Sequence, residues 1–240
     1  SAGDLVISAA GAALFTDSRY FIQAAQQLQG TGIELMKLGL PETPSIPACF
    51  GSHLAEGQRV GIDPRLHTHG AALELQRVLG RFGIELVSIE ENLVDPLWEA
   101  QPPMPSGAVE LLPLSVTGES RADKLARVRA VMKAEGHTHH VVTALDAIAW
   151  LMNMRGSDVE FNPVVIAYLI LSQEQCTLFT DLSKLSDSVR AALERDVALA
   201  PYEHVGDALA QIASERVLLD AGSVSRWVVD RLGHSDTVTH

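Results

Sequence analysis

Histidine is the residue type in this chain whose spacing first suggests chemistry. His137, His139 and His140 lie within four residues, and neutral imidazole is a common metal ligand. On a strand, however, His139 and His140 point to opposite faces and cannot meet at one ion. No HExxH, no CxxC and no spaced Asp/Glu set accompanies them. The sequence therefore predicts polar residues at a strand entrance and no metal site in this segment.

Nucleophilic catalysis lacks a motif as well. There is no GxSxG elbow, and neither Cys49 nor Cys176 lies in a local sequence that marks a reactive thiolate. Cys176 falls in an apolar run that is typical of a core strand. A glycine-rich phosphate loop is missing too, because Gly30-Thr-Gly32 reads as a turn. We therefore expect no catalytic residue in this segment.

The polar stretch Arg155-Gly-Ser-Asp158 interrupts an otherwise apolar region. Gly156 permits a tight reversal, across which Arg155 and Asp158 are expected to pair. Asn162-Pro163 favours an extended entry to the apolar run that follows. Two interpretations stay open on these residues alone: Arg155, Asp158 and Asn162 line a cleft, or the loop is scaffold.

Asp17-Ser-Arg19-Tyr20 is the second polar group, at the end of a predicted strand. The guanidinium of Arg19 offers a bidentate pair of donors to a carboxylate or a peptide carbonyl. Leu14–Asp17 recurs in the chain as Leu178–Asp181, but the residues that follow differ. An aspartate that caps a helix should persist in both copies, as this one does. Arg19 occurs in one copy only, which favours a binding function for it.

Composition limits the classes of protein that fit. The chain has 240 residues, of which 47% are hydrophobic, so it can bury one large core or two ordinary ones. A formal net charge of −12 argues against nucleic-acid binding. The longest apolar run, Val164–Leu171, is far short of the ~20 residues that a membrane span needs. Two cysteines are too few for a disulfide framework, so a reducing, cytoplasmic location is expected.

Strand and helix patterns alternate along the chain, as in α/β proteins. The apolar runs predict strands over 5–8, 13–16, 33–39, 59–63, 84–89, 139–145, 164–172 and 176–181. Helical spacing predicts helices over 18–28, 68–83, 120–136, 145–154 and 225–233, with Ser120 as an N-cap and Asp123 completing an approximate capping box. Residues 92–107 contain four prolines and form the best linker candidate.

The two predicted hairpins repeat at an offset of 164 residues. Leu5-Val6 corresponds to Leu169-Ile170 at this offset, and in both copies a helix and an Arg-Val strand ending in Asp follow. An old duplication explains this order and predicts two domains, residues 1–106 and 107–240. By the same offset, the first copy begins roughly fifty to sixty residues before Ser1, so a helix, a strand and a second helix are expected to be missing from its front end.

The quoted stretches resemble a known family. FTDSRYFIQAAQQL, GIDP, ENLVDPLW and above all VVTALDAIAWLMNMRGSDVEFNPVVIAYLIL are similar to Xaa-Pro aminopeptidases (aminopeptidase P) of the long, three-domain type. The resemblance covers nearly the whole chain and is strongest over residues 141–171. It implies two creatinase-N-like (ribonuclease-H-like) domains, each a mixed sheet flanked by helices.

The resemblance also implies a function for the parent protein. In the family, a third domain holds two divalent metal ions, usually manganese, and removes the N-terminal residue of peptides with proline in second position. This segment has no position for those ligands and is expected to be inactive alone. The Arg of the family's TDxRY stretch contacts substrate, and Arg19 matches it, although Ser18 stands where the family often has Gly. The loop with Arg155, Asp158 and Asn162 is expected to face the catalytic cavity.

Three hypotheses on the function of the chain follow from these expectations. In the first, the two domains restrict and line the cleft of a homodimeric, cytoplasmic metallo-aminopeptidase. In the second, of a different class, the chain is a non-catalytic peptide-binding or oligomerisation module without a peptidase domain. A prolidase or a creatinase is the third and fits less well, because such proteins have one N-terminal domain and the duplication indicates two.

Overall fold

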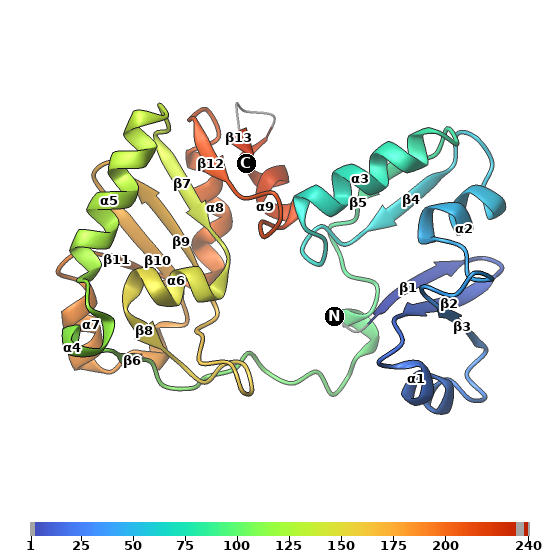
Figure 1. The fold of residues 1–240 in the computed structure, drawn as a ribbon, viewed down its shortest axis with the longest axis horizontal. Helices are drawn as coiled ribbons and strands as arrows, with labels where there is room; N and C mark the ends of the chain where they lie inside the picture. The colour runs from blue at the N-terminus through green and yellow to red at the C-terminus, as the bar shows by residue number, and fades with distance from the viewer. Residues whose placement is uncertain (1–2, 234–237, 240) are drawn as a thin grey trace. The chain divides into compact units, whose positions relative to one another are not determined.

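The structure is a computed structural model that describes residues 3–233 and 238–239 (Figure 1). It divides into two compact units. The first comprises the described residues up to Gly61 together with Leu73–Val87, and the second comprises Ile62–Ala72 and the described residues from Ser88 onward. Ser1 and Ala2, at the expected front-end break, lie outside the described residues. The domain boundary between residues 106 and 107 stays a prediction.

The strands of the N-terminal part form two small sheets. Strand β1 (Gly3–Ser8) is antiparallel to β2 (Gly11–Thr16), and β2 is parallel to β3 (Ile33–Lys37), which gives a mixed three-stranded sheet. β4 (Arg59–Ile62) and β5 (Glu85–Ser88) form a separate two-stranded sheet. The five strands predicted for this part of the chain are confirmed.

Three helices connect these strands, namely α1 (Phe21–Gln27), α2 (Ile46–His53) and α3 (His69–Gly80). α1 and α3 confirm the helical patterns, and they end three residues before Gly30 and Gly83, respectively. Gly30 and Gly83 have φ values of 77° and 68°, a left-handed conformation that favours glycine. Helix α2 was not predicted from the sequence.

The second unit is built on one mixed six-stranded sheet with the order β11-β10-β9-β7-β12-β13. β9 is antiparallel to both of its neighbours, and the other pairs are parallel. The strands are β7 (His139–Val142), β9 (Ala167–Ser172), β10 (Cys176–Thr180), β11 (Ala198–Pro201), β12 (Val217–Leu219) and β13 (Val238–Thr239). β6 (Glu110–Leu111) and β8 (Met154–Arg155) form a short antiparallel pair beside it.

Helices and turns complete the second unit. The helices are α4 (Leu114–Thr117), α5 (Arg121–Ala134), α6 (Leu145–Met152), α7 (Asp187–Leu193), α8 (Val205–Gln211) and α9 (Arg226–Leu232), and the 3-10 turns are η1 (Asp95–Leu97), η2 (Leu182–Lys184) and η3 (Tyr202–His204). Ser120 Oγ accepts a hydrogen bond from Asp123 N at 3.1 Å, which confirms the predicted N-cap of α5. Among residues 3–233 and 238–239, no helix is both long and apolar enough to cross a membrane.

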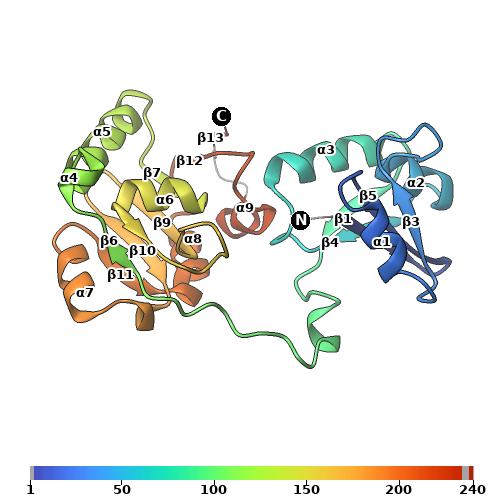
Figure 2. The ribbon, with the colours of Figure 1, turned by 60° about the horizontal axis from the view of Figure 1, so that its bottom comes forward.

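The core of the second unit lies in two layers, one on each face of the sheet. Leu169 and Leu171 of β9 pack with α5, α6 and α7, whereas Ile170 packs with α8 and α9. This alternation follows from the two-residue period of a strand. Figures 1 and 2 show α5 and α6 over one face of this sheet. Burial on both faces explains why β9 is a continuous apolar run rather than an alternating one.

The repeat is confirmed at the level of strand register. Leu5 pairs with Leu14 in the first copy, and at the offset of 164 Leu169 pairs with Leu178 in the second. The third strand keeps the offset, because Leu14 pairs with Leu35 and Leu178 pairs with Leu199. A duplicated fold accounts for this shared register, which a few matching letters arising by chance would not produce.

The two copies differ in what covers their central hairpin. Leu5 and Ile7 are 47% and 58% exposed, whereas their counterparts Leu169 and Leu171 are fully buried. The burial of the second pair comes from α5 and α6 and from β7, which also pairs with β9. In the described residues, β1 is an edge strand of its sheet and no such elements precede it. The segment expected before Ser1 stays a prediction.

Candidate functional site

A cavity of about 400 Å³ lies in the second unit, between α6, β8 and the loop that follows β8. Two of the residues singled out in the sequence, Arg155 and Asn162, line it. Trp150, Asp146 and Pro163 line it as well. A volume in this range is typical of small-ligand sites.

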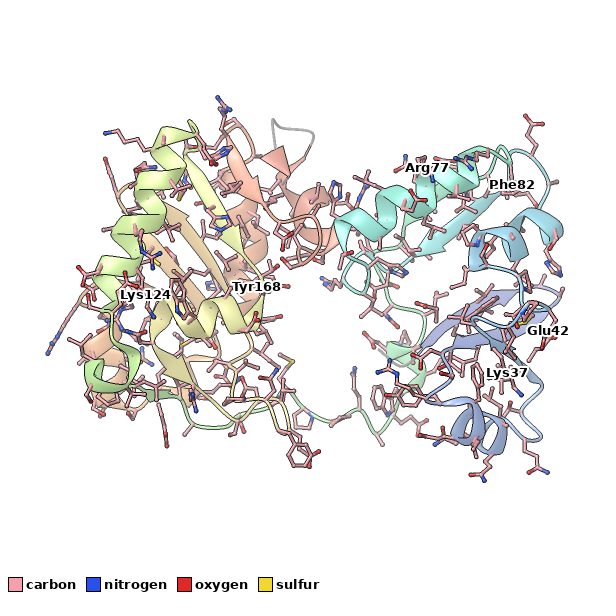
Figure 3. All side chains as sticks on the ribbon, in the orientation of Figure 1. Lys37, Glu42, Arg77, Phe82, Lys124 and Tyr168 are labelled. Carbon is pink, nitrogen blue, oxygen red and sulfur yellow. The ribbon has the colours of Figure 1, made fainter. Side chains whose placement is uncertain are left out.

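Lys124 forms one wall of this cavity and is 2% exposed (Figure 3). Its ammonium donates to the carbonyl oxygen of Trp150 at 2.8 Å and to Oδ1 of Asn153 at 2.6 Å. Nζ also lies 4.2 Å from the centroid of the Trp150 ring. Burial lowers the pKa of Lys124. The lysine thus caps the carboxyl end of α6, where a positive charge is favourable.

Asn153 continues this arrangement beyond the end of α6. It adopts a left-handed conformation with φ 50°, which asparagine tolerates better than most residues. Its Nδ2 donates to the carbonyl oxygen of Glu119 at 2.9 Å. The helix end, which carries the cavity-lining Trp150, is therefore fixed to the segment before α5.

Arg155 and Asn162 contribute polar groups that other described residues do not engage. Within residues 3–233 and 238–239, the Arg155 guanidinium makes no hydrogen bond or ion pair, and the Asn162 side-chain amide makes no hydrogen bond. The backbone of Arg155 is fixed, since it pairs with Glu110 across β6 and β8. Both residues are exposed and have donors to spare.

Asp158 lies elsewhere, and its expected pairing with Arg155 is wrong. Its carboxylate accepts from Lys184 Nζ at 2.8 Å and from Ile166 N at 2.7 Å, with both charged side chains almost fully buried. A buried carboxylate needs a buried partner, and Arg155 on β8 faces outward. Asp158 thus anchors the loop inside the unit, and it is not among the residues that line the cavity.

The loop conformation also differs from the one predicted. Gly156 has no left-handed φ, and its requirement is space, because a Cβ there would lie 2.7 Å from Val165 Cγ2. The reversal occurs later, at Phe161, which has a φ of 61° and is 97% exposed. The predicted strand over 164–172 begins in the ladder only at Ala167.

Arg19 lies on the surface of the first unit. Its Nε and Nη2 donate to the two carboxylate oxygens of Asp17 at 2.9 and 2.7 Å, so the bidentate geometry expected of it is present but directed within the chain. Hydrogen bonds from Arg19 lower the pKa of Asp17 to about 2. Asp17 also accepts from Arg19 N, as Asp181 does from Ser183 N in the second copy. The turn at the aspartate is shared, but the expected helix cap is wrong for Asp17, because α1 begins after Tyr20 without a side-chain cap. Asp181 caps the short 3-10 turn η2.

The histidines and cysteines singled out in the sequence do not line this cavity. His140 Nδ1 lies 3.0 Å from Leu218 O, whereas His139 Nδ1 lies near Thr138 Oγ1, so the two side chains diverge as predicted. Across the described part of the chain, no three His, Cys, Asp or Glu side chains are grouped as metal ligands would be. Cys176 is buried, as expected, and burial raises the pKa of its thiol to about 12.

Sequence reasoning missed Trp150 and Lys124. A signal for Lys124 is present, because it lies four residues before Val128 on the apolar stripe of α5, where a lysine needs a partner. Trp150 is 49% exposed near the end of α6, but nothing in the local sequence distinguishes it from a core tryptophan.

The fold and the repeated register define a pair of related α/β domains, and comparison with known families agrees. Models described as the Creatinase/Prolidase N-terminal domain match residues 1–97 and residues 100–240. The chain belongs to the creatinase/prolidase N-terminal domain family, and both of its copies are such domains.

Relatives of this chain are aminopeptidases. It is 40% identical over 220 residues to Xaa-Pro aminopeptidase ApepP of Drosophila melanogaster, covering 90% of this chain and 36% of that protein. It is 38% identical over 234 residues to Aminopeptidase P2 of Arabidopsis thaliana, covering 95% of this chain and 33% of the relative. The chain thus spans about a third of the length of these relatives.

A solved structure is similar over almost the whole chain. The X-prolyl aminopeptidase of Caenorhabditis elegans, described as a cytosolic enzyme with a di-nuclear active site, matches with a TM-score of 0.91 and 29% identity. The match covers 99% of this chain and 40% of that one. The resemblance to Xaa-Pro aminopeptidases is therefore confirmed by both sequence and structure.

Proposed function

We propose that this chain is the N-terminal part of a metallo-aminopeptidase that releases the first residue of peptides with proline in second position. The observation that carries the proposal is its similarity, over most of its length, to Xaa-Pro aminopeptidases that are about three times as long. In this role the two domains line and restrict the active-site cleft and support a homodimer. The protein is proposed to be cytoplasmic, as the Caenorhabditis elegans enzyme is described.

The chemistry itself is assigned to another part of the whole protein. A dinuclear centre, proposed to hold two manganese ions, needs a cluster of carboxylate and imidazole ligands. The described residues of this chain contain no such cluster and do not fit a metal centre. We therefore derive no catalytic step from these two domains.

Arg19 is proposed to contact the substrate peptide. Its side chain is 73% exposed, and its guanidinium already makes a bidentate contact with a carboxylate, that of Asp17. The aspartate orients the guanidinium without burying it, so donors that do not bond to Asp17 can reach a peptide carbonyl. Arg155 and Asn162 are proposed to line the part of the cleft that the second unit contributes, with Asp158 fixing their loop from within.

Substitution of Arg19 tests this role. In the full-length enzyme, Arg19→Ala is expected to lower kcat/KM for a Xaa-Pro peptide by roughly tenfold, because a charge-assisted contact is lost. Arg81→Ala is the matched control, since Arg81 is also an exposed arginine of the first unit. An unchanged kcat/KM for Arg19→Ala, with the melting temperature preserved, would remove Arg19 from substrate binding.

A further inference from the structure

The cavity in the second unit combines an arginine that has no bonded partner among the described residues with an exposed apolar surface, which we call the apolar shelf. Arg155 presents a guanidinium that makes no ion pair or hydrogen bond in the described part of the chain. The shelf beside it consists of Trp150, Val116 and Pro163, which line the same cavity and are exposed. A partly exposed indole and an arginine without a bonded partner in one concave site together offer an apolar contact and a charged donor to a single ligand.

The charges around the cavity favour an anion. Lys124 and Arg155 line it, against a single carboxylate, that of Asp146. Asp146 already accepts a hydrogen bond from Ala147 N at 2.9 Å, at the start of α6. Lys124 hydrogen-bonds only to neutral oxygens of the described residues, and the Glu119 carboxylate, which pairs with Arg127, attracts it only at longer range. This local excess of positive charge stands in a chain of net charge −12.

The types of residue that line the cavity suit a carboxylate on an apolar group. A guanidinium recognises a planar carboxylate through two parallel hydrogen bonds. The Asn162 amide, free to donate or accept, lies at the same cavity and suits a peptide group next to that carboxylate. Lys124 and Arg127 lie 4.2 and 5.5 Å from the centroid of the Trp150 ring, and the part of this half-exposed side chain that they leave open can contact an aliphatic side chain. A volume of about 400 Å³ accommodates one or two residues rather than a folded partner.

We infer that this cavity binds a carboxylate borne on an apolar group, with Arg155 holding the carboxylate and Trp150 packing against the apolar part. A peptide C-terminus and an acidic side chain within a peptide share this chemistry, and the chain end is the source that the small cavity favours. This site is separate in sequence and in unit from Arg19, and it does not depend on peptidase activity.

Ligand titration of the 240-residue protein tests the inference directly. N-acetyl-leucine and N-acetyl-leucinamide differ only in their carboxylate, and binding is followed by the ¹⁵N-labelled indole of Trp150 and by calorimetry. The acid is expected to bind roughly tenfold or more tightly than the amide. Equal affinities for the two probes, or no binding of either, would overturn the inference.

Variants separate the site from general charge effects. Arg155→Ala is expected to weaken binding of the acid by roughly tenfold, and Trp150→Leu to weaken both probes. Arg195→Ala is the control, because Arg195 is an exposed arginine of the same unit that does not line the cavity. Arg155→Lys keeps the charge and should restore only part of the affinity. Binding that survives Arg155→Ala, or that falls equally with Arg195→Ala, contradicts the assignment.

A second pair of probes identifies the source of the carboxylate. A tripeptide ending in leucine with a free C-terminus is compared with the same peptide amidated and carrying glutamate in the middle position. Tighter binding of the free C-terminus supports recognition of chain ends. Preference for the internal glutamate contradicts that part of the inference.

Discussion

At the scale of single residues, His140 links burial to the pH dependence of stability. It is partly buried on β7, and its Nδ1 lies 3.0 Å from the carbonyl oxygen of Leu218, which can only accept a hydrogen bond. Burial lowers the pKa of His140 in the folded state. The unfolded chain therefore takes up a proton near the ordinary histidine pKa of about 6.5 before the folded protein does. Stability should accordingly fall as the pH drops below that value.

Substitution of His140 should change how steeply the free energy of unfolding varies with pH. Between pH 7 and 5.5, the free energy of unfolding of the wild type should decrease, and His140→Gln should reduce this decrease. One group contributes at most about 1.4 kcal/mol per pH unit. All three tryptophans, Trp98, Trp150 and Trp227, lie in the second unit, so their fluorescence in urea reports on the unit that contains His140.

His204→Gln serves as the control, because His204 is exposed in the same unit. If the pH profiles of His140→Gln and the wild type run parallel across this window, burial of His140 does not govern the acid sensitivity.

Residue-level reasoning recognised the polar groups but not their partners. Arg155 and Asn162 stood out because they interrupt an apolar region, and both reach the cavity. Asp158 stood out for the same reason, yet its partner is Lys184, which follows it by 26 positions. Lys184 comes into reach only through the hairpin of β9 and β10. No local pattern encodes that approach.

At the scale of elements, the duplication is an internal control on packing. Leu5 and Leu169 occupy the same position in two hairpins of identical register. One is 47% exposed and the other is fully buried under α5 and α6. The same residue type in the same strand position thus contributes differently because of its surroundings.

Truncation of each leucine should measure that difference. Leu169→Ala is expected to lower the free energy of unfolding by about 2–5 kcal/mol, through lost burial and the cavity left behind. Leu5→Ala should cost less than about 1 kcal/mol, since the position is already hydrated in part. Urea unfolding followed by far-UV circular dichroism and by tryptophan fluorescence gives both values.

The test compares the losses in free energy of unfolding of the two variants with each other, rather than either loss with an absolute value. Similar losses for Leu5→Ala and Leu169→Ala would mean that Leu5 is covered in solution. The account of an uncovered first sheet would then be wrong.

Element prediction succeeded where periodicity is strong and failed at α2. Pro41 and Pro44 before this helix, together with Pro47 in its first turn, suggest a loop. Pro47 lies in the first turn of the helix, where a proline costs nothing because its missing N–H would be unpaired anyway. Ser45 Oγ accepts from Ala48 N at 3.3 Å and marks the N-cap. The sequence contains this signal, but the surrounding prolines outweigh it.

At the scale of the whole molecule, the chain consists of two copies of one domain type. The repeat, read from a few residues at an offset of 164, extends through three strands of each copy. A similar turn, at a shorter offset, ends each Arg-Val strand, where Asp63 accepts from Arg65 N and Asp220 from Gly222 N. Fold class was therefore predictable from the sequence. The walls of the cavity were not, because they combine α4, α5, α6 and β8.

The proposal is that these two domains line a cleft for chemistry that another part of the protein performs. Its most direct test is the release of the N-terminal residue from a Xaa-Pro peptide by the purified 240-residue chain in saturating manganese. The account predicts no release above the buffer rate, because the described residues hold no group of metal ligands. Turnover that a chelator abolishes would contradict it.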